Sequence, residues 1–285
     1  MLIFDPMSLY ITSLNSGSNG NCYYIGNDKH AVLIDAGISC RETEKRMKRL
    51  GLDITRVRAI VVSHEHGDHI TGIPGLSKKY KFPVYITTNT LRSSNLPIEK
   101  ELIRSFKPYE SILIGDLSVN AFPKFHDACD PHSFLVTHNG IKVGVFTDIG
   151  SSCKHVISHF KQCHAAFLEA NYCEEMLENG NYPYHLKRRI SGDNGHLSNT
   201  QALELFNTHK GKQLSYLILS HLSKNNNSPE LVNQLFNKHA GDINIIVASR
   251  YVETPIFLID KKGHLPLSRL DHSPTASPKK QLTLF

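Results

Sequence analysis

The run His64-Glu65-His66-Gly67-Asp68-His69 constrains the fold more than any other part of this chain. It follows directly on residues 57–62, a β-branched run that predicts a buried strand. Loops at strand ends commonly carry chemistry, because a rigid scaffold holds them. In a tight turn His64 and His66 can bind one ion, while Asp68 and His69 reach a second position. The motif therefore predicts a hydrolase with two metal ions ~3.5–4 Å apart and a hydroxide that bridges them.

Two such ions need further ligands and a shared carboxylate from other parts of the chain. Asp148 follows a predicted strand at 141–147 and is well placed for the shared position. His126 and His221 likewise lie at strand ends. A single histidine in such a place is more often a surface or hydrogen-bonding residue. Together with the motif, however, the three residues complete two coordination shells.

Short strands and interspersed helices recur in two halves of the chain. The strands predicted from periodicity and turn residues cover 8–14, 22–25, 31–34, 57–62, 83–86, 111–114, 117–122, 133–137, 141–147, 165–168, 214–219, 243–247 and 256–259. The predicted helices cover 39–50, 73–80, 199–209 and 229–239, and Ser39 and Gly51 are the expected caps of the first. This alternation favours an α+β fold in which two sheets pack between helices, an αββα sandwich.

Length and composition set outer limits on the chain. A chain of 285 residues can form one catalytic domain, expected over 1–260, before a basic tail at 261–285 that is predicted to be flexible. No apolar run approaches the ~18 residues of a membrane span, and the N-terminus lacks the pattern of a signal peptide, so we expect a cytoplasmic protein with no membrane partner. Six cysteines without a Cys-x-x-Cys pair indicate reduced thiols. The net charge of +6 allows a polyanionic partner without requiring one.

The order of these residues resembles the five motifs of the metallo-β-lactamase fold, over residues 8–260. The resemblance implies a dinuclear site at the sheet edge, with His64, His66 and His126 on the first ion. It places Asp68, His69 and His221 on the second ion and Asp148 between the two. It also implies that Asp35 orients the motif loop through contacts with the ligands and does not itself bind an ion. A ligand set of His and Asp without cysteine favours Zn²⁺ or Mn²⁺.

Two further segments resemble the Glu-Ala-Thr and His-Ser-Thr segments of the ribonuclease Z group. They are Leu168-Glu169-Ala170-Asn171-Tyr172 and Gly195-His196-Leu197-Ser198-Asn199. In that group a Glu-paired histidine lies over the metals and helps the leaving oxygen to accept a proton. The resemblance implies that Glu169 holds His196 as the general acid, beside Asp68 as the residue that steers the attacking group. The alternative is a surface histidine next to Ser198 or Asn199 as a helix cap.

The same segments, together with Ser16-Gly17-Ser18-Asn19-Gly20-Asn21-Cys22, His185-Leu186-Lys187-Arg188-Arg189-Ile190 and Leu219-Ser220-His221-Leu222-Ser223, resemble the bacterial WalJ/YycJ group. The similarity covers nearly the whole folded region. It implies a phosphodiesterase, namely a 5′→3′ DNA exonuclease of replication or repair, usually supported by manganese. DNA, single- or double-stranded, is then the expected partner.

Two segments are candidate phosphate contacts. The loop that contains Ser16, Ser18 and Asn21 can nest an anion with its N–H groups, or it is a plain hairpin turn. Lys187, Arg188 and Arg189 form a basic cluster that can pair with backbone phosphates, or they are a solvated helix face.

The last five residues, Gln281-Leu282-Thr283-Leu284-Phe285, resemble the pentapeptide by which many bacterial DNA enzymes bind the replicative sliding clamp. Leu282, Leu284 and Phe285 would enter an apolar groove while Gln281 fixes the register. The alternative is a terminal strand or a segment that docks on the core.

Two other functions remain open at this stage. A thioester or lactone hydrolase of the same fold would need the same metals but neither the basic cluster nor the tail. A non-catalytic adaptor would keep the fold alone, and the complete ligand set argues against it.

Overall fold

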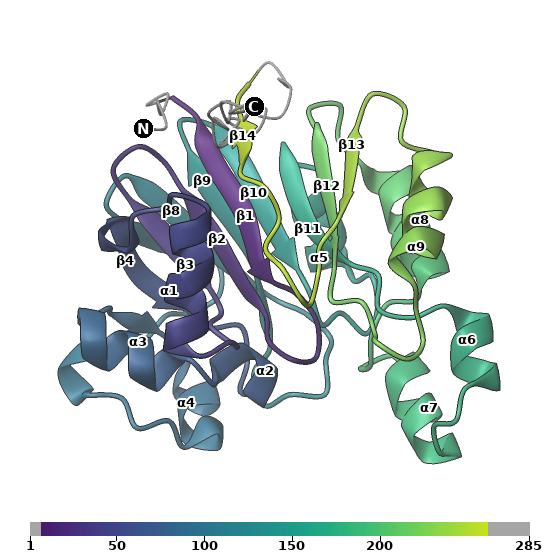
Figure 1. The fold of residues 1–285 in the computed structure, drawn as a ribbon, viewed down its shortest axis with the longest axis horizontal. Coiled ribbons are helices and arrows are strands. Elements are labelled where there is room, and N and C mark those ends of the chain that lie inside the picture. The colour runs from purple at the N-terminus through teal and green to yellow at the C-terminus, as the bar shows by residue number, and fades with distance from the viewer. Residues whose placement is uncertain (1–6, 262–285) are drawn as a thin grey trace, which may run out of the picture.

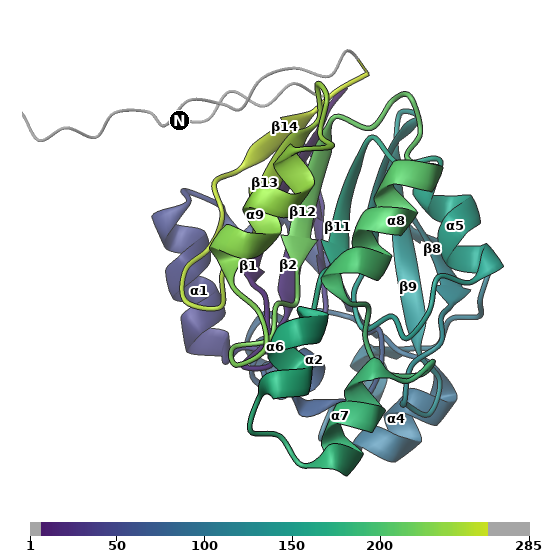
Figure 2. The same ribbon diagram turned by 90° about the vertical axis from the view of Figure 1, so that its right-hand side faces the viewer.

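Two mixed β-sheets face each other and helices cover both outer sides (Figure 1). The computed structural model describes residues 7–261. Viewed from the side in Figure 2, α5, α8 and α9 lie over the outer face of the second sheet. This is the αββα sandwich that the alternation of strands and helices predicts. The clamp-binding peptide predicted at 281–285 lies outside the described residues.

The first sheet has seven strands in the order β14-β1-β2-β3-β4-β5-β6. Its strands are β1 (Leu9–Asn15), β2 (Cys22–Gly26), β3 (Ala31–Ile34), β4 (Val57–Val61), β5 (Val84–Tyr85), β6 (Ile103–Arg104) and β14 (Phe257–Ile259). Pairing is antiparallel from β14 to β3 and parallel from β3 to β6. The strands predicted at 22–25 and 31–34 pair as the β2–β3 hairpin, and β14 returns from the far end of the chain to pair with β1.

The second sheet repeats this plan in the order β13-β12-β11-β10-β9-β8-β7. Its strands are β7 (Ser111–Ile114), β8 (Leu117–Pro123), β9 (His132–His138), β10 (Ile141–Phe146), β11 (Ala165–Glu169), β12 (Tyr216–Ser220) and β13 (Asn244–Val247). Pairing is antiparallel from β7 to β10 and parallel from β10 to β13. The parallel strands therefore bring their carboxyl ends to one edge, where loops can converge.

Helices form the two outer layers and part of the edge. On the first sheet's side lie α1 (Cys40–Arg49), α2 (Gly67–Ile70), α3 (Ile73–Tyr80), α4 (Thr88–Ser94) and the 3₁₀ turns η1 (Ile54–Arg56) and η2 (Lys100–Leu102). The other helices are α5 (Lys154–Phe160), α6 (Glu174–Asn179), α7 (Tyr184–Ser191), α8 (Asn199–His209) and α9 (Pro229–Asn237). The predicted caps of α1 are present: Ser39 accepts a hydrogen bond from the Glu42 N–H, and Gly51 follows with φ +69°. Among residues 7–261 every helix is too short or too polar to span a bilayer.

Three apolar clusters correspond to the three contacts between layers. The central cluster joins both sheets and includes Ile11, Val61 and Phe167. A second cluster packs the first sheet against α1 and α3, and a third packs the second sheet against α5, α8 and α9. Each sheet is thus buried on both faces, as the alternation of side chains along a strand permits. The core holds the strand ends rigidly, and these strand ends carry the residues discussed next.

Candidate metal centre

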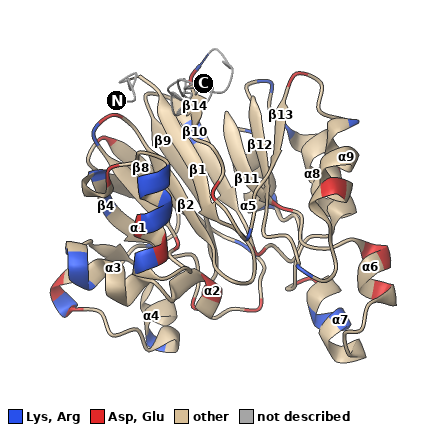
Figure 3. Ribbon diagram, in the orientation of Figure 1, with Lys and Arg blue, Asp and Glu red and all other residues tan. Residues whose placement is uncertain are grey.

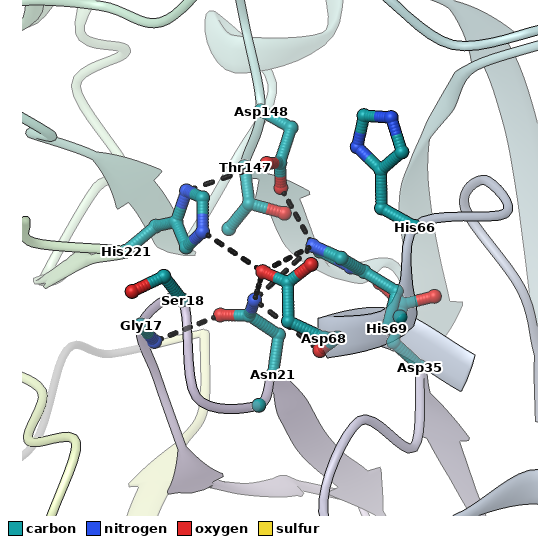
Figure 4. Close-up of polar contacts among 12 residues, drawn as sticks. Gly17, Ser18, Asn21, Asp35, His66, Asp68, His69, Thr147, Asp148 and His221 are labelled. Atoms are coloured by element: carbon teal, nitrogen blue, oxygen red, sulfur yellow. Dashed lines mark hydrogen bonds and ion pairs between the residues drawn. The ribbon is translucent and has the colours of Figure 1, made fainter. Parts of the chain in front are cut away.

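The predicted site residues gather at one edge of the two sheets. Asp35 follows β3, the histidine motif follows β4, Asp148 follows β10, and His221 follows β12. Asp35, Asp148 and His221 have positive φ angles of 58°, 54° and 58°. A non-glycine residue in this left-handed region costs about 1–3 kcal/mol, and such residues concentrate at functional sites. The sharp turn after each strand directs these side chains toward one point (Figure 4).

All seven side chains predicted as ligands converge at this point. These side chains form four overlapping groups, and within each group the ligand atoms all lie within 4.8 Å of one another. The groups are His64, His66 and His126; Asp68, His69 and His221; His64, His69 and Asp148; and Asp148, Glu169, His196 and His221. The first two groups are the two sets that the fold resemblance implies. Asp148 belongs to both of the others, so it lies between the two sets. The arrangement can hold divalent metal ions.

The first set directs its nitrogen lone pairs inward. The Ser63 hydroxyl donates to Asp35 Oδ2 at 2.7 Å, so its oxygen accepts from His64 Nδ1 at 2.8 Å. His126 Nδ1 donates to the Gly195 carbonyl at 3.0 Å. Each ring therefore leaves Nε2 without a proton, and both Nε2 atoms face His66 Nδ1 at 3.1 and 3.3 Å. His66 Nδ1 carries at most one proton and can donate to only one of these two nitrogens, so at least one inward lone pair stays unmatched unless a cation binds there.

The second set shows the same pattern. His69 Nδ1 donates to Asp35 Oδ2 at 2.7 Å, and His221 Nδ1 donates to Glu169 Oε1 at 2.8 Å. His221 Nε2 then faces Asp68 Oδ2 at 3.4 Å. Within the described part of the chain, His221 Nε2 and Asp148 Oδ2 are buried without a well-formed hydrogen bond, and Asp148 Oδ2 has an ionic contact with His69 Nε2 at 3.1 Å. Buried atoms that converge on a common space and each supply an electron pair fit a bound cation, so the residues present fit divalent ions.

The charges of the cluster point the same way. Burial keeps the pKa of His64 well below its ordinary value and lowers the pKa of His126 to about 4, so both rings are neutral. Burial opposes the charge of Asp68, yet His69 and His221 hold its pKa at about 2. Burial likewise opposes the charge of His69, but Asp148, Asp68 and Asp35 raise its pKa to about 10. A metal ion that binds here must therefore displace a proton.

Glu169 connects the centre to His196. This carboxylate is fully buried, and its Oε1 accepts from His196 Nδ1 and from His221 Nδ1, both at 2.8 Å. Its Oε2 accepts from the backbone N–H groups of Ile149 at 2.8 Å and Leu197 at 3.1 Å. The His196 ring lies against the rings of His126 and His221, and its side chain stays 20% exposed. His196 is thus held in one orientation and still reaches solvent.

Ser198 does cap α8, as the alternative reading of this segment proposed. Its hydroxyl accepts from the Gln201 N–H at 3.1 Å, and the Ser198 N–H donates to the Gln201 side-chain oxygen. The cap and the Glu169–His196 pair therefore occur together. The helix cap fixes the backbone that presents His196 to the metal centre.

The loop between β1 and β2 lies beside the centre, but two of its predicted phosphate contacts face inward. Ser16 is buried, and its oxygen accepts from the His221 N–H and contacts the Tyr23 hydroxyl, both at 2.8 Å. Asn21 is buried, and its Nδ2 lies 3.1 Å from both Asp68 Oδ2 and His69 Nε2 (Figure 4). These contacts position the ligands and leave no side-chain group free for phosphate. Ser18 alone of the three is exposed.

The predicted basic cluster lies on α7, which projects at the same end of the molecule as α2 (Figure 3). Arg189 pairs with Asp127, whose other oxygen is 3.4 Å from His126 Nε2. Lys187 donates to the Glu178 carbonyl, and Arg188 is exposed beside it. Lys187 and Arg188 line a hollow between α6 and α7. The cluster is therefore beside the centre, as expected, and it is also a solvated helix face.

Sequence reasoning missed three residues at or beside the centre. Ser63 joins Asp35 to His64, as described above. Lys124 is buried and donates to the Thr147 carbonyl at 2.7 Å, so it brings a positive charge next to Asp148. Arg250 lies over Gly17 and donates to Ser18 Oγ at 2.8 Å. Nothing in the local pattern distinguishes these residues from ordinary surface lysine, arginine and serine, because each acquires its place only through long-range packing.

Comparison with known proteins agrees with the geometry. Residues 16–150 match the family model of the metallo-beta-lactamase superfamily. The chain is 36% identical over 230 residues to Exodeoxyribonuclease YycJ of Bacillus anthracis, covering 79% of this chain and 86% of that protein. It is 29% identical over 256 residues to Exodeoxyribonuclease WalJ of Streptococcus pneumoniae, covering 85% and 95%. The crystal structure of the metallo-beta-lactamase fold protein YhfI from Bacillus subtilis superposes with a TM-score of 0.68 at 14% identity, over 88% of this chain and 99% of YhfI. The superfamily and the His/Asp cluster together indicate a divalent-metal site.

Proposed function

We propose that this chain, which belongs to the YycJ/WalJ group of the metallo-β-lactamase superfamily, is a metal-dependent exodeoxyribonuclease. The observation that carries the proposal is the pair of ligand sets that share Asp148, with His196 beside them. A phosphodiester needs a strong nucleophile, charge neutralisation and a proton for its leaving oxygen, and this centre offers a source for each. The relatives named above supply the substrate class, DNA.

The ligand assignment is part of this proposal. His64, His66 and His126 would hold one ion, Asp68, His69 and His221 the other, and Asp148 would lie between them. When bound, the ions would polarise a phosphoryl oxygen and lower the pKa of a coordinated water. Mn²⁺ and Zn²⁺ both suit imidazole and carboxylate ligands, and we favour Mn²⁺ because Asp68 and Asp148 add carboxylate oxygens, which suit manganese, and no thiolate is present.

The chain's own residues supply the remaining steps. Asp68 accepts from Asn21 Nδ2 at 3.1 Å, and this contact fixes the carboxylate that steers the attacking water. His196 can give a proton to the leaving oxygen, because Glu169 holds its Nδ1 and leaves Nε2 to face the substrate. Glu169 thus acts through His196 and His221 as a positioning residue.

DNA would approach along the end of the molecule that carries α7. Arg188 is exposed there, and Arg189 is anchored by Asp127 next to His126. Guanidinium groups bind phosphates strongly, and each such contact makes affinity depend on salt. Lys187, Arg188 and Arg189 are therefore proposed to hold the strand. We further propose 5′→3′ polarity, a role in DNA replication or repair, and binding of residues 281–285 to a sliding clamp.

End-labelled DNA tests the function. The protein is incubated with Mn²⁺ and DNA that carries the label at either the 5′ or the 3′ end, beside an Asp68→Ala variant and a chelator control. We expect metal-dependent release of mononucleotides that starts at the 5′ end, and loss of this activity in Asp68→Ala. Absence of phosphodiester cleavage together with metal-dependent turnover of a thioester would replace the proposal with a small-molecule hydrolase. Release from the 3′ end would contradict the polarity alone.

A further inference from the structure

A hollow of about 250 Å³ adjoins the metal centre. The loop after β12 and the loop after β13 form its walls, together with Ser16. Ser16 accepts from the His221 N–H at 2.8 Å, and Leu222 lines the hollow directly after that histidine. The wall of this hollow therefore begins at the residue next to a proposed metal ligand. A group bound here would lie next to the reacting phosphate.

The hollow has the charge of an anion site. Lys224 and Arg250 line it, and within the described residues its walls include no aspartate or glutamate. Arg250 uses Nη2 to donate to Ser18 Oγ at 2.8 Å. Its Nη1 is buried and has no hydrogen-bond partner among the residues that the structure describes. A buried cationic donor without a partner is costly, so this atom calls for an acceptor that is not part of the chain.

Two hydroxyl groups add further donors. Ser249 Oγ accepts from the Tyr251 N–H at 3.0 Å, and Ser223 Oγ accepts from the Asn226 N–H at 3.3 Å. These bonds use the oxygen lone pairs of both residues, so each hydroxyl proton can point toward a ligand. Both serines line the hollow. The polar groups of the walls thus combine two cations with two available O–H donors.

The remaining wall is apolar and suits a sugar or base. Val247, Ala248 and Pro229 form it, and Tyr251 stands at the rim with 68% of its surface exposed. An exposed aromatic ring beside a phosphate site is a surface on which a base can stack. The apolar wall and the ring of Tyr251 therefore lie beside the cationic groups of the same hollow. A free phosphate would use only the cationic half of the hollow.

We propose that this hollow is a nucleotide subsite, in which Arg250 and Lys224 bind the phosphate next to the scissile one and Tyr251 and the apolar wall hold its nucleoside. The inference rests on the proposed function and deepens it. It assigns Arg250, Lys224 and Tyr251 to substrate binding, which neither the sequence motifs nor the metal geometry does.

Kinetics on two substrates test the subsite in the Mn²⁺-loaded protein. DNA requires the hollow, whereas bis(p-nitrophenyl) phosphate has no adjoining nucleotide and reports the metal centre alone. Arg250→Gln should lower kcat/KM on DNA about 10- to 100-fold, mainly through KM, because a charge-assisted hydrogen bond is lost. Its turnover of bis(p-nitrophenyl) phosphate should stay unchanged. Arg250→Lys should recover most of the loss, and Arg58→Gln, at an exposed position on β4, is the matched control.

Salt dependence gives an independent readout. Arg250→Gln and Lys224→Gln should each reduce the slope of log kcat/KM against log salt by about 0.7, because each removes one phosphate contact to a single strand. An equal loss on both substrates would overturn the subsite and make Arg250 a tether for the loop at Ser18. Unchanged DNA cleavage in Arg250→Gln would overturn it as well. If the unchanged protein turns over bis(p-nitrophenyl) phosphate but not DNA, the proposed function fails and the subsite fails with it.

Discussion

The replacement Glu169→Gln tests how the metal centre controls the protons on its histidines. Glu169 Oε2 accepts from two backbone N–H groups that cannot reverse, those of Ile149 and Leu197. In the variant the amide oxygen must take this place, so the NH₂ group faces His196 and His221. An NH₂ group donates, and both rings must then accept at Nδ1 and carry their proton on Nε2. His221 Nε2, which faces Asp68, would no longer be a free ligand atom.

The size of the effect follows from these contacts. Loss of a partner that fixes a ligating histidine costs about 10- to 100-fold in metal affinity, or about 1.4–2.7 kcal/mol. The ion held by His64, His66 and His126 should bind nearly as before, because none of these residues touches Glu169. We therefore expect one weakened and one unchanged metal site. DNA cleavage should fall further than metal affinity alone requires, since His196 also loses its orientation.

Calorimetric titration of metal-free protein with Mn²⁺ measures both sites. DNA cleavage at saturating Mn²⁺ then separates the effect on binding from the effect on proton transfer. Glu204→Gln, an exposed position on α8, is the matched control for the change in charge. Two unchanged binding events in Glu169→Gln, together with unchanged cleavage, would refute the role of Glu169 in fixing the tautomers.

Three other changes have definite expected outcomes. Gly37→Ala would place its Cβ 1.7 Å from the Asp68 carbonyl oxygen, so we expect a loss of about 1–3 kcal/mol in the free energy of unfolding and weaker Mn²⁺ binding; thermal denaturation and calorimetry check both. Glu44 accepts hydrogen bonds from Lys79 and Cys40, which lower its pKa from 4.5 to about 2. The pKa of Glu44 is lower in the folded protein than in the unfolded chain, so its ionised carboxylate stabilises the fold. This contribution is less than about 1 kcal/mol, because Glu44 lies near the surface. It is complete above pH 4.5 and is lost as the pH falls toward 2. Denaturant unfolding should therefore show Glu44→Gln to be less stable at pH 7, with the difference narrowing in acid; a difference independent of pH would contradict this. Deletion of residues 281–285 should abolish retention on an immobilised sliding clamp and leave the DNA cleavage rate unchanged, whereas unchanged retention would exclude the pentapeptide.

The convergence of the proposed metal ligands could be predicted because each of them lies at or shortly after the end of a predicted strand. The fold brings these strand ends to one edge. The network behind the ligands could not be predicted. Ser63 and Lys124 act through partners 28 and 23 residues away, and local sequence does not encode these contacts.

The long helices and most strands agree with the sequence patterns, and the short helices do not. α2 has only four residues and α6 only six, too few to show a helical period. α2 begins inside the histidine motif, where its first turn is fixed by packing of Gly37 against Asp68. The phosphate contacts expected at Ser16 and Asn21 show the same limit. The sequence of a Ser/Asn/Gly loop does not show whether its side chains contact a ligand or support the residues that do.

All of the proposed chemistry depends on two ions that lie on either side of Asp148. Anomalous diffraction from a crystal soaked in Mn²⁺ locates them directly. We expect two peaks ~3.5–4 Å apart, one within ligand distance of His64, His66 and His126 and the other of Asp68, His69 and His221. A single peak in a crystal whose dissolved protein still cleaves DNA at the full rate would contradict the two-metal centre.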